Sequence, residues 1–263
     1  MRLVTWNINS VRLRLPLLLR LIEEQQPDVI CLQETKTVNE TFPMAALAEQ
    51  GYVHTNVHGM KGYNGVAILS RLPLSDPGTP DWCERRDCRH AHALLPGGIE
   101  LHNLYIPAGG DIPDPAQNEK FAHKLRFLDE ITDWLARTYT PDRPMILVGD
   151  LNIAPLEHDV WSHKQLLDVV SHTPVEVERM ARLQESLGWI DVMRNFVPPD
   201  QKLYTWWSYR SADWAASDRG RRLDHIWKTP ALKGTARNMI VLKEARSWQQ
   251  PSDHVPVIID FDV

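Results

Sequence analysis

The chain has 263 residues, 43% of them hydrophobic, and a formal net charge of −5. This length fits one large domain or two small ones, and the apolar content is enough for a sizeable core. The apolar runs are shorter than the roughly 18 residues that a membrane-spanning helix needs. The acidic balance argues mildly against a nucleic-acid binder, but a carboxylate-rich metal site makes a chain acidic and a local basic stripe can accompany it.

The N-terminal segment and the cysteines indicate the compartment. Arginines occur throughout the first residues, and no apolar stretch with a cleavage site follows, so we expect no signal peptide. Cys31, Cys83 and Cys88 are odd in number and do not suggest a disulfide framework, which favours a reducing cytoplasm. Cys83 and Cys88 precede His90 and His92, but their spacing matches no compact zinc motif, and we expect no zinc site from these four residues.

Hydrophobic periodicity predicts many strands with a few helices between them. The first strand covers 2–8, and a helix follows near 10–26, with Ser10 as its N-cap. Further strands are expected at 28–34, 65–70, 89–95, 99–106, 145–149, 203–209, 221–227, 236–242 and 255–263, and helices at 116–138 and near 175–187. The "PGG" between 89–95 and 99–106 indicates a hairpin. With no linker or repeat, this order predicts one α/β sandwich domain over 1–263.

The stretch "VGDLNIAP", residues 148–155, ends an apolar run with a carboxylate and an amide. Side chains two residues apart in a strand point the same way, so Asp150 and Asn152 are expected side by side, about 7 Å apart. Pro155 helps to end the strand. The pair is therefore a candidate for holding a ligand at a strand end.

Polar side chains stand at or near the ends of five predicted strands. Because loops at one rim of a sheet often carry functional residues, we expect these ends to converge. Oxygen ligands suit a hard cation such as Mg²⁺, and the cation and the amides suit a phosphate. Each residue alone fits ordinary turn chemistry, so the prediction rests on the joint pattern. The residues are Asn7, Glu34, Asp150, Asn152, Asp224, Asp253 and His254.

Seven sequence blocks, in order, carry a resemblance to a known family. They are "TWNINS", "LQETK", "YIPAGGD", "GDLNIAP", "YTWWSYRS", "RLDHI" and "PSDHVPV", and the resemblance spans residues 4–257. They resemble the signature blocks of the exonuclease III-type apurinic/apyrimidinic (AP) endonucleases of the DNase I-like endonuclease/exonuclease/phosphatase superfamily. The resemblance implies a four-layer αββα sandwich in one domain. It also implies cleavage of phosphodiesters in damaged double-stranded DNA with Mg²⁺, for which Mn²⁺ can substitute.

The resemblance further implies roles for the residues at the strand ends. Glu34 matches the principal metal ligand, and Asn7 lies in the same shell. Asp150 matches the carboxylate that orients or deprotonates the attacking water. His254 matches the imidazole that binds the scissile phosphate, and Asp253 matches the partner that fixes its tautomer.

Three more positions complete the implied site. Asn152 matches the amide that positions the carboxylate and the phosphate, and Tyr105 matches a tyrosine near the leaving oxygen. Asp224 matches a carboxylate that braces the site or serves a second metal. The implied metal site as a whole contains Asn7, Glu34, Asp150, Asn152, Asp253 and His254.

Aromatic and basic residues are candidates for contact with DNA. Trp206 matches the aromatic wall of the pocket for the flipped-out abasic sugar, whereas Trp207 alternates to the other face and is expected in the core. Basic residues near the long helix and before "LDHI" are candidates for binding phosphates, although a solvated charged face explains each one equally well. The candidates are Lys120, Lys124, Arg221 and Arg222.

Two segments depart from the family pattern. Ala108, Gly109 and Gly110 stand where some relatives place a longer polar side chain that enters the duplex. Residues 156–175 lack a crisp match and are expected to border the substrate pocket. We hypothesise that His163 or His172 narrows or charges that pocket and shifts the balance between AP cleavage and the cleaning of 3′ ends.

These observations predict a DNA repair nuclease that incises 5′ to AP sites. We also expect 3′→5′ exonuclease and 3′-phosphatase or phosphodiesterase activity. The expected partner is double-stranded DNA with AP sites or blocked 3′ ends, and we expect a monomer without membrane attachment or an obligate protein partner. The alternatives are a superfamily phosphohydrolase with another substrate, a 3′-end-cleaning enzyme with weak AP incision, and a catalytically silent DNA-binding relative.

Overall fold

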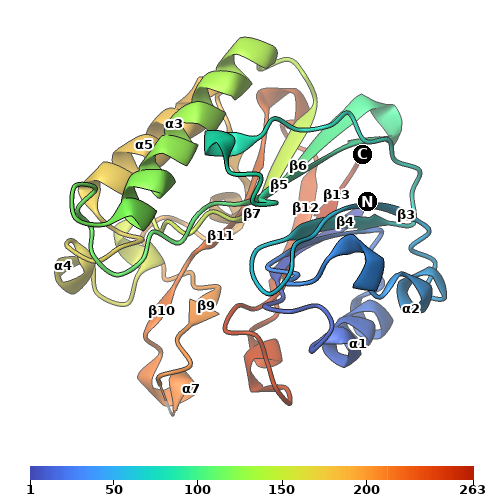
Figure 1. The fold of residues 1–263 in the computed structure, drawn as a ribbon, viewed down its shortest axis with the longest axis horizontal. Coiled ribbons are helices and arrows are strands. Elements are labelled where there is room, and N and C mark those ends of the chain that lie inside the picture. Colours follow the sequence, from blue (N-terminus) through green and yellow to red (C-terminus); the bar gives the residue numbers. More distant parts are fainter. Residues whose placement is uncertain (212) are drawn as a thin grey trace.

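The computed structural model describes residues 1–211 and 213–263. Two β-sheets lie face to face, with helices on both outer faces (Figure 1). The first sheet has the order β12-β13-β1-β2-β4-β3. Its strands are β1 (Arg2–Asn7), β2 (Val29–Gln33), β3 (His54–His58), β4 (Val66–Ser70), β12 (Ala236–Val241) and β13 (Val257–Phe261).

The second sheet has the order β5-β6-β7-β11-β8, and a short separate ribbon pairs β9 with β10. The strands of the second sheet are β5 (His90–Leu95), β6 (Ile99–Tyr105), β7 (Met145–Asp150), β8 (Ile190–Asp191) and β11 (Asp224–Lys228). The ribbon consists of β9 (Trp206–Trp207) and β10 (Gly220–Arg221).

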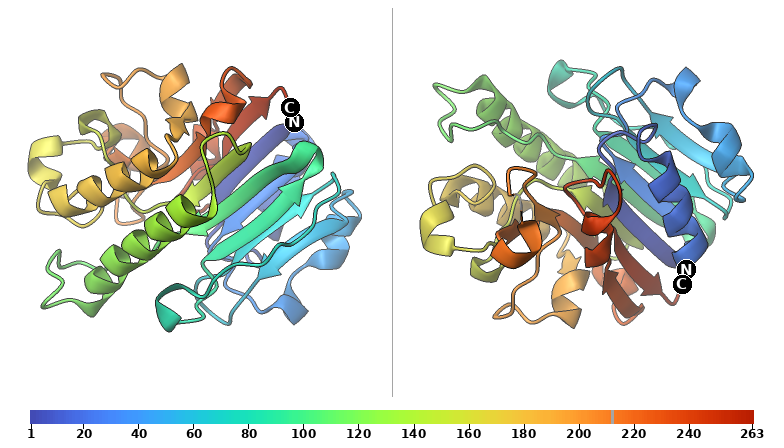
Figure 2. Two further views of the ribbon diagram at one scale, coloured as in Figure 1. Left: turned by 90° about the horizontal axis from the view of Figure 1, so that it is seen from above. Right: turned by 90° about the horizontal axis from the view of Figure 1, so that it is seen from below.

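Helices cover the two outer faces (Figure 2). α1 (Leu15–Gln25) and α2 (Met44–Ala48) lie on the side of the first sheet, and α3 (Glu119–Thr138) and α5 (Pro174–Ser186) pack together on the second. The connections contain the short helices α4 (His163–Leu166), α6 (Val192–Phe196) and α7 (Trp214–Ser217). None of the described helices is long and apolar enough to cross a membrane.

Alternation along the strands produces three apolar layers between four layers of secondary structure. In β1, Leu3 faces the core between the two sheets, whereas Val4 lies in the core beneath α1. In β7, Ile146 and Val148 face the core between the sheets, whereas Leu147 packs in the core beneath α3 and α5. These strands are buried on both faces, which explains their continuous apolar runs.

The structure confirms the predicted α/β sandwich and the 89–106 hairpin, and it corrects several boundaries. α1 begins at Leu15 after Arg14, so Ser10 is not its N-cap, because a turn at 11–14 precedes the helix and Pro16 fits its first turn. α3 begins at Glu119, where the Asn118 side chain accepts a hydrogen bond from the amide of Lys120. The expected strand at 203–209 shortens to β9, and β3 was not predicted.

The topology brings several strand ends to one rim. β1 pairs with β2 in parallel, and β6 pairs with β7 in parallel, so each pair ends at the same edge of its sheet. β11 runs antiparallel to β7, and its first residue therefore lies beside the last residue of β7. This rim is where the polar strand-end residues meet.

Candidate active site

Strand ends of both sheets supply the polar cluster. Asn7 is the last residue of β1, and Glu34 directly follows β2. Asp150 ends β7, where its register neighbours are Tyr105 on β6 and Asp224 on β11. The two sheets together therefore position one group of buried side chains, because each contributes from the same rim.

Asp150 and Asn152 meet through a turn, not through the strand that the sequence suggested. β7 ends at Asp150, and Asn152 has a left-handed backbone with φ 54°. This turn brings the Asn152 amide N–H to 3.0 Å from Asp150 Oδ1 and its Nδ2 to 3.2 Å from Oδ2. The Asn152 Nδ2 also donates to the carbonyl oxygen of Ile106 at 2.9 Å. The turn therefore lets the two residues hydrogen-bond directly, which the predicted extended strand, with its side chains about 7 Å apart, would not allow.

One amide joins two carboxylates from different sheets. The Asn7 Nδ2 donates to Glu34 Oε1 at 2.9 Å and to Asp150 Oδ2 at 2.8 Å. The Lys36 ammonium lies 2.7 Å from Glu34 Oε2. Glu34 itself has φ 51°, a backbone region that a non-glycine residue adopts at a cost and that often occurs at functional sites. Asn7 and Lys36 thus hold the Glu34 carboxylate in place, and Asn7 also holds that of Asp150.

The ring of His254 lies between two aspartates. Its Nδ1 donates to Asp224 Oδ2 at 2.8 Å, and its Nε2 lies 3.7 Å from Asp150 Oδ2. The sequence assigned the first of these contacts to Asp253, and the structure corrects that assignment. Asp253 Oδ2 instead accepts from Trp206 Nε1 at 2.9 Å, because adjacent residues in an extended segment point to opposite sides.

The pKa values of the cluster follow from burial and pairing. Burial alone would lower the pKa of His254, but Asp224 and Asp150 raise it to about 10 and so favour the imidazolium. Burial raises the pKa of Asp150, and the nearby carboxylate of Asp224 adds to this increase against the effect of His254. Burial opposes ionisation of Glu34 too, yet Lys36 and Asn7 hold its pKa below the ordinary value.

Tyr105 lies beside the same carboxylates and remains a neutral phenol. Burial raises its pKa well above the ordinary value, and the charges of Glu34 and Asp150 raise it further. The Arg89 guanidinium stacks 4.9 Å from the centre of the ring. A neutral phenol at this position can donate a proton or a hydrogen bond.

The donor set fits a divalent cation. Glu34 and Asp150 present carboxylate oxygens around one amide, which is the kind of ligand that hard cations prefer. Asp224 Oδ1 is buried without a hydrogen-bond partner among the described residues. Ligand atoms of Asp150, Asp224 and His254 lie within 4.8 Å of one another. The rim therefore carries more negative charge than its own hydrogen bonds neutralise.

Trp206 borders the cluster and is half-buried against the 154–169 segment. The Arg221 guanidinium lies 5.3 Å from the centre of its ring and donates to the carbonyl oxygen of Val170 and to Ser171 Oγ. Trp207 packs in the core, as expected. Arg221 thus connects Trp206 to residues 170–171, which lie in the segment without a crisp match to the family pattern.

The prediction that Lys124 and Arg222 bind DNA is wrong, because both side chains are fully buried. The Lys124 ammonium lies 2.5 Å from Glu176 Oε1 and donates to the carbonyl oxygen of Asn152 at 2.7 Å. The Arg222 guanidinium pairs with Asp159 and Asp191. Lys120 is exposed and Arg221 is partly exposed, so the structure keeps both as candidates.

Lys36 is a site residue that the sequence analysis missed. It follows Glu34 by two residues within the block "LQETK", and both residues have positive φ. Its ammonium contacts Glu34 and donates to Asn9 Oδ1 at 2.6 Å. The lysine two residues after Glu34 was the feature of the sequence from which this site residue could have been predicted.

The chain is similar to known proteins in sequence and in fold. The model of the endonuclease/exonuclease/phosphatase family matches residues 4–254. Exodeoxyribonuclease III of Haemophilus influenzae is 31% identical, over 99% of this chain and all of the relative. An AP endonuclease structure from Archaeoglobus fulgidus has a TM-score of 0.91 at 33% identity, with 100% of both chains covered. A 3′ phosphatase from Neisseria, solved bound to a product DNA hairpin, has a TM-score of 0.87 at 32% identity, again over 100% of both chains.

Proposed function

Because the chain belongs to the endonuclease/exonuclease/phosphatase family, we propose that it is a DNA repair nuclease of the exonuclease III type. It hydrolyses the phosphodiester 5′ to abasic sites in double-stranded DNA and leaves a 3′-hydroxyl. It also removes nucleotides and blocking groups from 3′ ends. The observation that carries this proposal is the meeting of Glu34, Asp150 and His254 at one rim of the two sheets.

Mg²⁺ is the proposed cofactor, with Mn²⁺ as a substitute. Glu34, Asn7 and Asp150 would hold the ion, because the Asn7 side chain lies between the two carboxylates. When bound, the ion supplies charge neutralisation at the phosphoryl oxygens and a more acidic water. We place Asp253 and His254 outside the set of ligands, because Asp253 Oδ2 accepts from Trp206 and His254 Nδ1 donates to Asp224. Asn152 is placed outside it because its side chain donates to Asp150 and to the carbonyl oxygen of Ile106.

Asp150 is the proposed general base. Its raised pKa suits a group that takes a proton from water near neutral pH. Asn7 and Asn152 donate to its oxygens and hold the carboxylate in one orientation. A fixed base at a rigid strand end can align the attacking oxygen with the leaving oxygen.

His254 and Tyr105 are the proposed contacts of the phosphate and the leaving oxygen. The imidazolium of His254 directs Nε2 toward the cluster while Asp224 holds Nδ1, so a positive hydrogen-bond donor faces the phosphoryl group. The phenol of Tyr105 is neutral and can donate to the leaving oxygen. Asp224 orients His254 and does not touch the substrate in this scheme.

Trp206 is the proposed wall for the extruded abasic sugar, since a flat apolar ring accepts a small sugar and excludes a full nucleotide. Arg221 stacks on this ring and keeps it in place. Lys120 is exposed at the start of α3 and is proposed to bind a DNA phosphate. We further propose that residues 1–263 act as one catalytic domain, as a monomer without a protein partner, in the cytoplasm.

A second candidate is an enzyme that cleans 3′ ends and incises AP sites only weakly. Two observations favour it. Ala108 is exposed and followed by two glycines, so this loop offers no long side chain to enter the duplex. The 154–169 segment packs beside Trp206, so part of the stretch that lacks a crisp match to the family pattern borders the proposed pocket.

One assay separates the two candidates. Purified protein is given matched duplexes that carry an AP analogue, a recessed 3′-hydroxyl or a 3′-phosphate, each with Mg²⁺ and with EDTA. We expect Mg²⁺-dependent turnover of all three, with the AP duplex preferred over intact DNA, RNA and small phosphate esters. Turnover of the 3′-phosphate alone would favour the second candidate. Metal-independent turnover, or none in any duplex, would overturn the proposal.

A further inference from the structure

The ammonium of Lys124 lies inside the molecule, between α3, which carries it, and α5, which carries its partner Glu176. An ammonium has three N–H donors and no acceptor, and three acceptors surround this one. They are Glu176 Oε1 at 2.5 Å, the carbonyl oxygen of Asn152 at 2.7 Å and that of Ala108 at 3.3 Å. Each donor therefore has an acceptor, as a fully buried charge requires.

The Glu176 carboxylate is held from its own side as well. It lies in the first turn of α5, where Oε2 accepts from the amide of Ser171 at 2.9 Å and from the hydroxyl of Thr173 at 2.6 Å. Its Oε1 accepts from the same Ser171 amide at 3.0 Å. These bonds fix the carboxylate, and the carboxylate fixes the Lys124 ammonium, before any substrate binds.

The contact with Asn152 connects this ion pair to the candidate active site. Asn152 has φ 54°, a left-handed conformation that costs a non-glycine residue free energy unless its surroundings hold it. Its carbonyl oxygen accepts from Lys124, whereas its amide N–H and its Nδ2 donate to the two oxygens of Asp150, at 3.0 and 3.2 Å. Lys124 therefore anchors one side of the turn whose other side orients Asp150.

The loop at Ala108 and Gly109 packs closely around the Lys124 side chain. Gly109 has φ 91°, and a Cβ at this position would lie 3.0 Å from Lys124 Cδ and 3.0 Å from Val170 Cγ1. Glycine suits both the positive φ and the close approach. The 108–109 loop, the 170–173 segment and the turn at Asn152 therefore all meet at this lysine.

We propose that Lys124 is a positioning residue of the nuclease reaction, which holds the Asn152 turn and, through it, the proposed base Asp150 in the reactive orientation. This inference rests on the proposed function. Lys124 is fully buried, so it acts through these hydrogen bonds and does not touch the DNA. Its loss should consequently slow the chemical step and leave the affinity for DNA unchanged.

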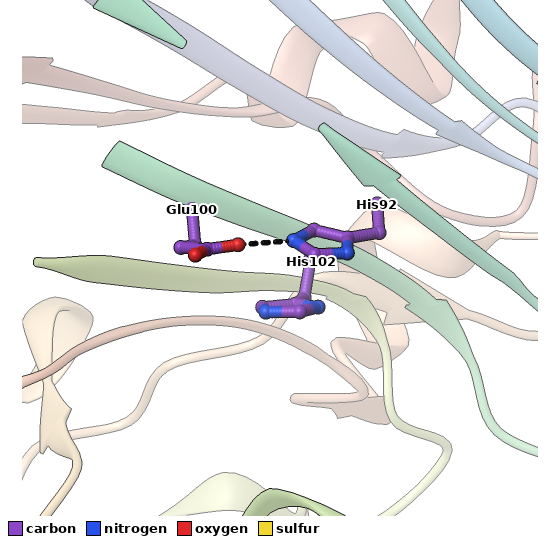
Figure 3. A group of neighbouring side chains, drawn as sticks. All are labelled: His92, Glu100 and His102. Carbon is purple, nitrogen blue, oxygen red and sulfur yellow. Dashed lines mark hydrogen bonds and ion pairs between the residues drawn. The ribbon is translucent and has the colours of Figure 1, made fainter. Parts of the chain in front are cut away.

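A second buried cluster, on the β5–β6 hairpin, supplies a matched control. Glu100 Oε2 lies 2.5 Å from His92 Nε2, the rings of His92 and His102 stack with centroids 4.2 Å apart (Figure 3), and Glu100 Oε1 accepts from Arg143. Glu100 precedes Tyr105 by five residues on β6, which places it about 17 Å from the rim along an extended strand. Its loss removes a buried carboxylate without disturbing the Asn152 turn.

Single-turnover kinetics with a saturating excess of enzyme test the proposal, because the rate constant is then independent of the fraction of protein that folds. The substrate is an AP-analogue duplex with Mg²⁺, and Kd for the same duplex is measured by fluorescence anisotropy in EDTA. Lys124→Met should lower the rate constant by about 10²-fold, the typical effect of a small misplacement of a reacting group, with Kd unchanged. Glu100→Met should lower the melting temperature and change neither quantity.

Lys124→Gln is a milder variant for the case in which Lys124→Met does not fold. Its amide retains N–H donors one atom closer to the backbone, so its rate constant should lie between those of the wild type and Lys124→Met. A wild-type rate constant in the folded variant, or equal falls in Lys124→Met and Glu100→Met, would overturn the positioning role. Wild-type protein that does not cleave the duplex would instead overturn the proposed function, and this inference with it.

Discussion

Two buried groups of charged side chains lie a few residues apart in the chain and are paired in different ways. At the active-site rim, Asp150 has Asp224 as a neighbour, and burial and that neighbour raise its pKa. In the other group, Asp159 accepts two bonds from Arg222, at 2.7 and 2.9 Å, and also pairs with Arg194. Burial opposes ionisation there too, but the guanidiniums lower the pKa of Asp159.

The difference shows how a functional cluster departs from a structural one. Every oxygen of the Asp159 carboxylate has a partner in the structure, whereas Asp224 Oδ1 has none among the described residues. An unbalanced carboxylate cluster destabilises the fold unless a cation or a substrate joins it. Substitutions at the rim should therefore affect activity, whereas substitutions around Asp159 should affect stability.

The largest expected effect is on catalysis. Asp150→Asn removes the proposed base and should lower kcat on an AP duplex by about 10²–10⁴-fold. It also relieves the repulsion with Asp224, so the melting temperature should stay the same or rise. Single-turnover kinetics and a thermal melt check both points. A variant with wild-type kcat, or one that loses much of its stability, would show that the rim is a structural network like that of Asp159.

Arg222→Met should have the opposite effect, a large loss of stability. It leaves the carboxylates of Asp159 and Asp191 without their shared guanidinium, and breaking a buried pair in this way typically costs about 3–5 kcal/mol of unfolding free energy. Urea denaturation measures the loss. Arg219→Met, at an exposed position on the same segment, is the control and should change stability little. Equal effects of the two substitutions would contradict the structural role of Arg222.

The pH dependence of stability tests the same pairing. The native pKa of Asp159 is below its unfolded value of about 3.9, so its contribution is complete above that pH. That contribution is lost as the pH falls through the native pKa. Asp159→Asn should therefore show a flatter fall in unfolding free energy between about pH 5 and pH 2 than the wild type. Identical slopes in the two proteins would show that Asp159 does not contribute to the pH dependence of stability.

Lys120 and Lys124 sharpen the contrast between a surface cation and a buried one. Lys120→Gln should raise KM for DNA a few-fold and lower the slope of log affinity against log salt by about 1, with kcat unchanged. Lys233→Gln, at an exposed lysine beyond the opposite end of β11, should do neither. Lys124→Met should instead lower the melting temperature, because it leaves Glu176 unpaired. A loss of salt dependence in Lys124→Met would restore it as a DNA contact.

The sequence predicted what local patterns determine. Short apolar runs located most of the strands, and the motif blocks identified the strand-end residues that meet at the rim. It failed where a side chain is paired with a distant residue. Lys124 and Arg222 looked like exposed cations because their partners, Glu176 and Asp159, lie far along the chain.

The partner of His254 illustrates the same limit. Asp253 is adjacent in sequence, but Asp224, thirty residues away, holds the ring. Backbone geometry was also invisible to the sequence. The positive φ of Asn152 brings its amide to Asp150 within a turn that strand periodicity cannot predict. Charge and residue type locate a site, whereas the assignment of partners depends on topology.

The smallest expected effect concerns the segment beside Trp206. His172 is buried, its Nε2 bonded to His163 and its Nδ1 bonded to the carbonyl oxygen of Ala154. Burial lowers the pKa of His172, so it contributes shape more than charge. His172→Gly removes the ring that supports this segment and should widen the pocket, which would raise AP incision a few-fold relative to 3′-phosphate removal.

Rates on matched AP and 3′-phosphate duplexes give this ratio directly, and a ratio is insensitive to the fraction of protein that folds. His163→Ala is the companion variant, because His163 is exposed and its loss leaves the buried ring in place. A shift in the His172 variant alone assigns specificity to the buried support of the segment. A shift in both variants assigns it to the histidine pair. An unchanged ratio in both would leave the pocket's selectivity with Trp206 and Arg221, since these side chains alone would then define the wall that the sugar meets.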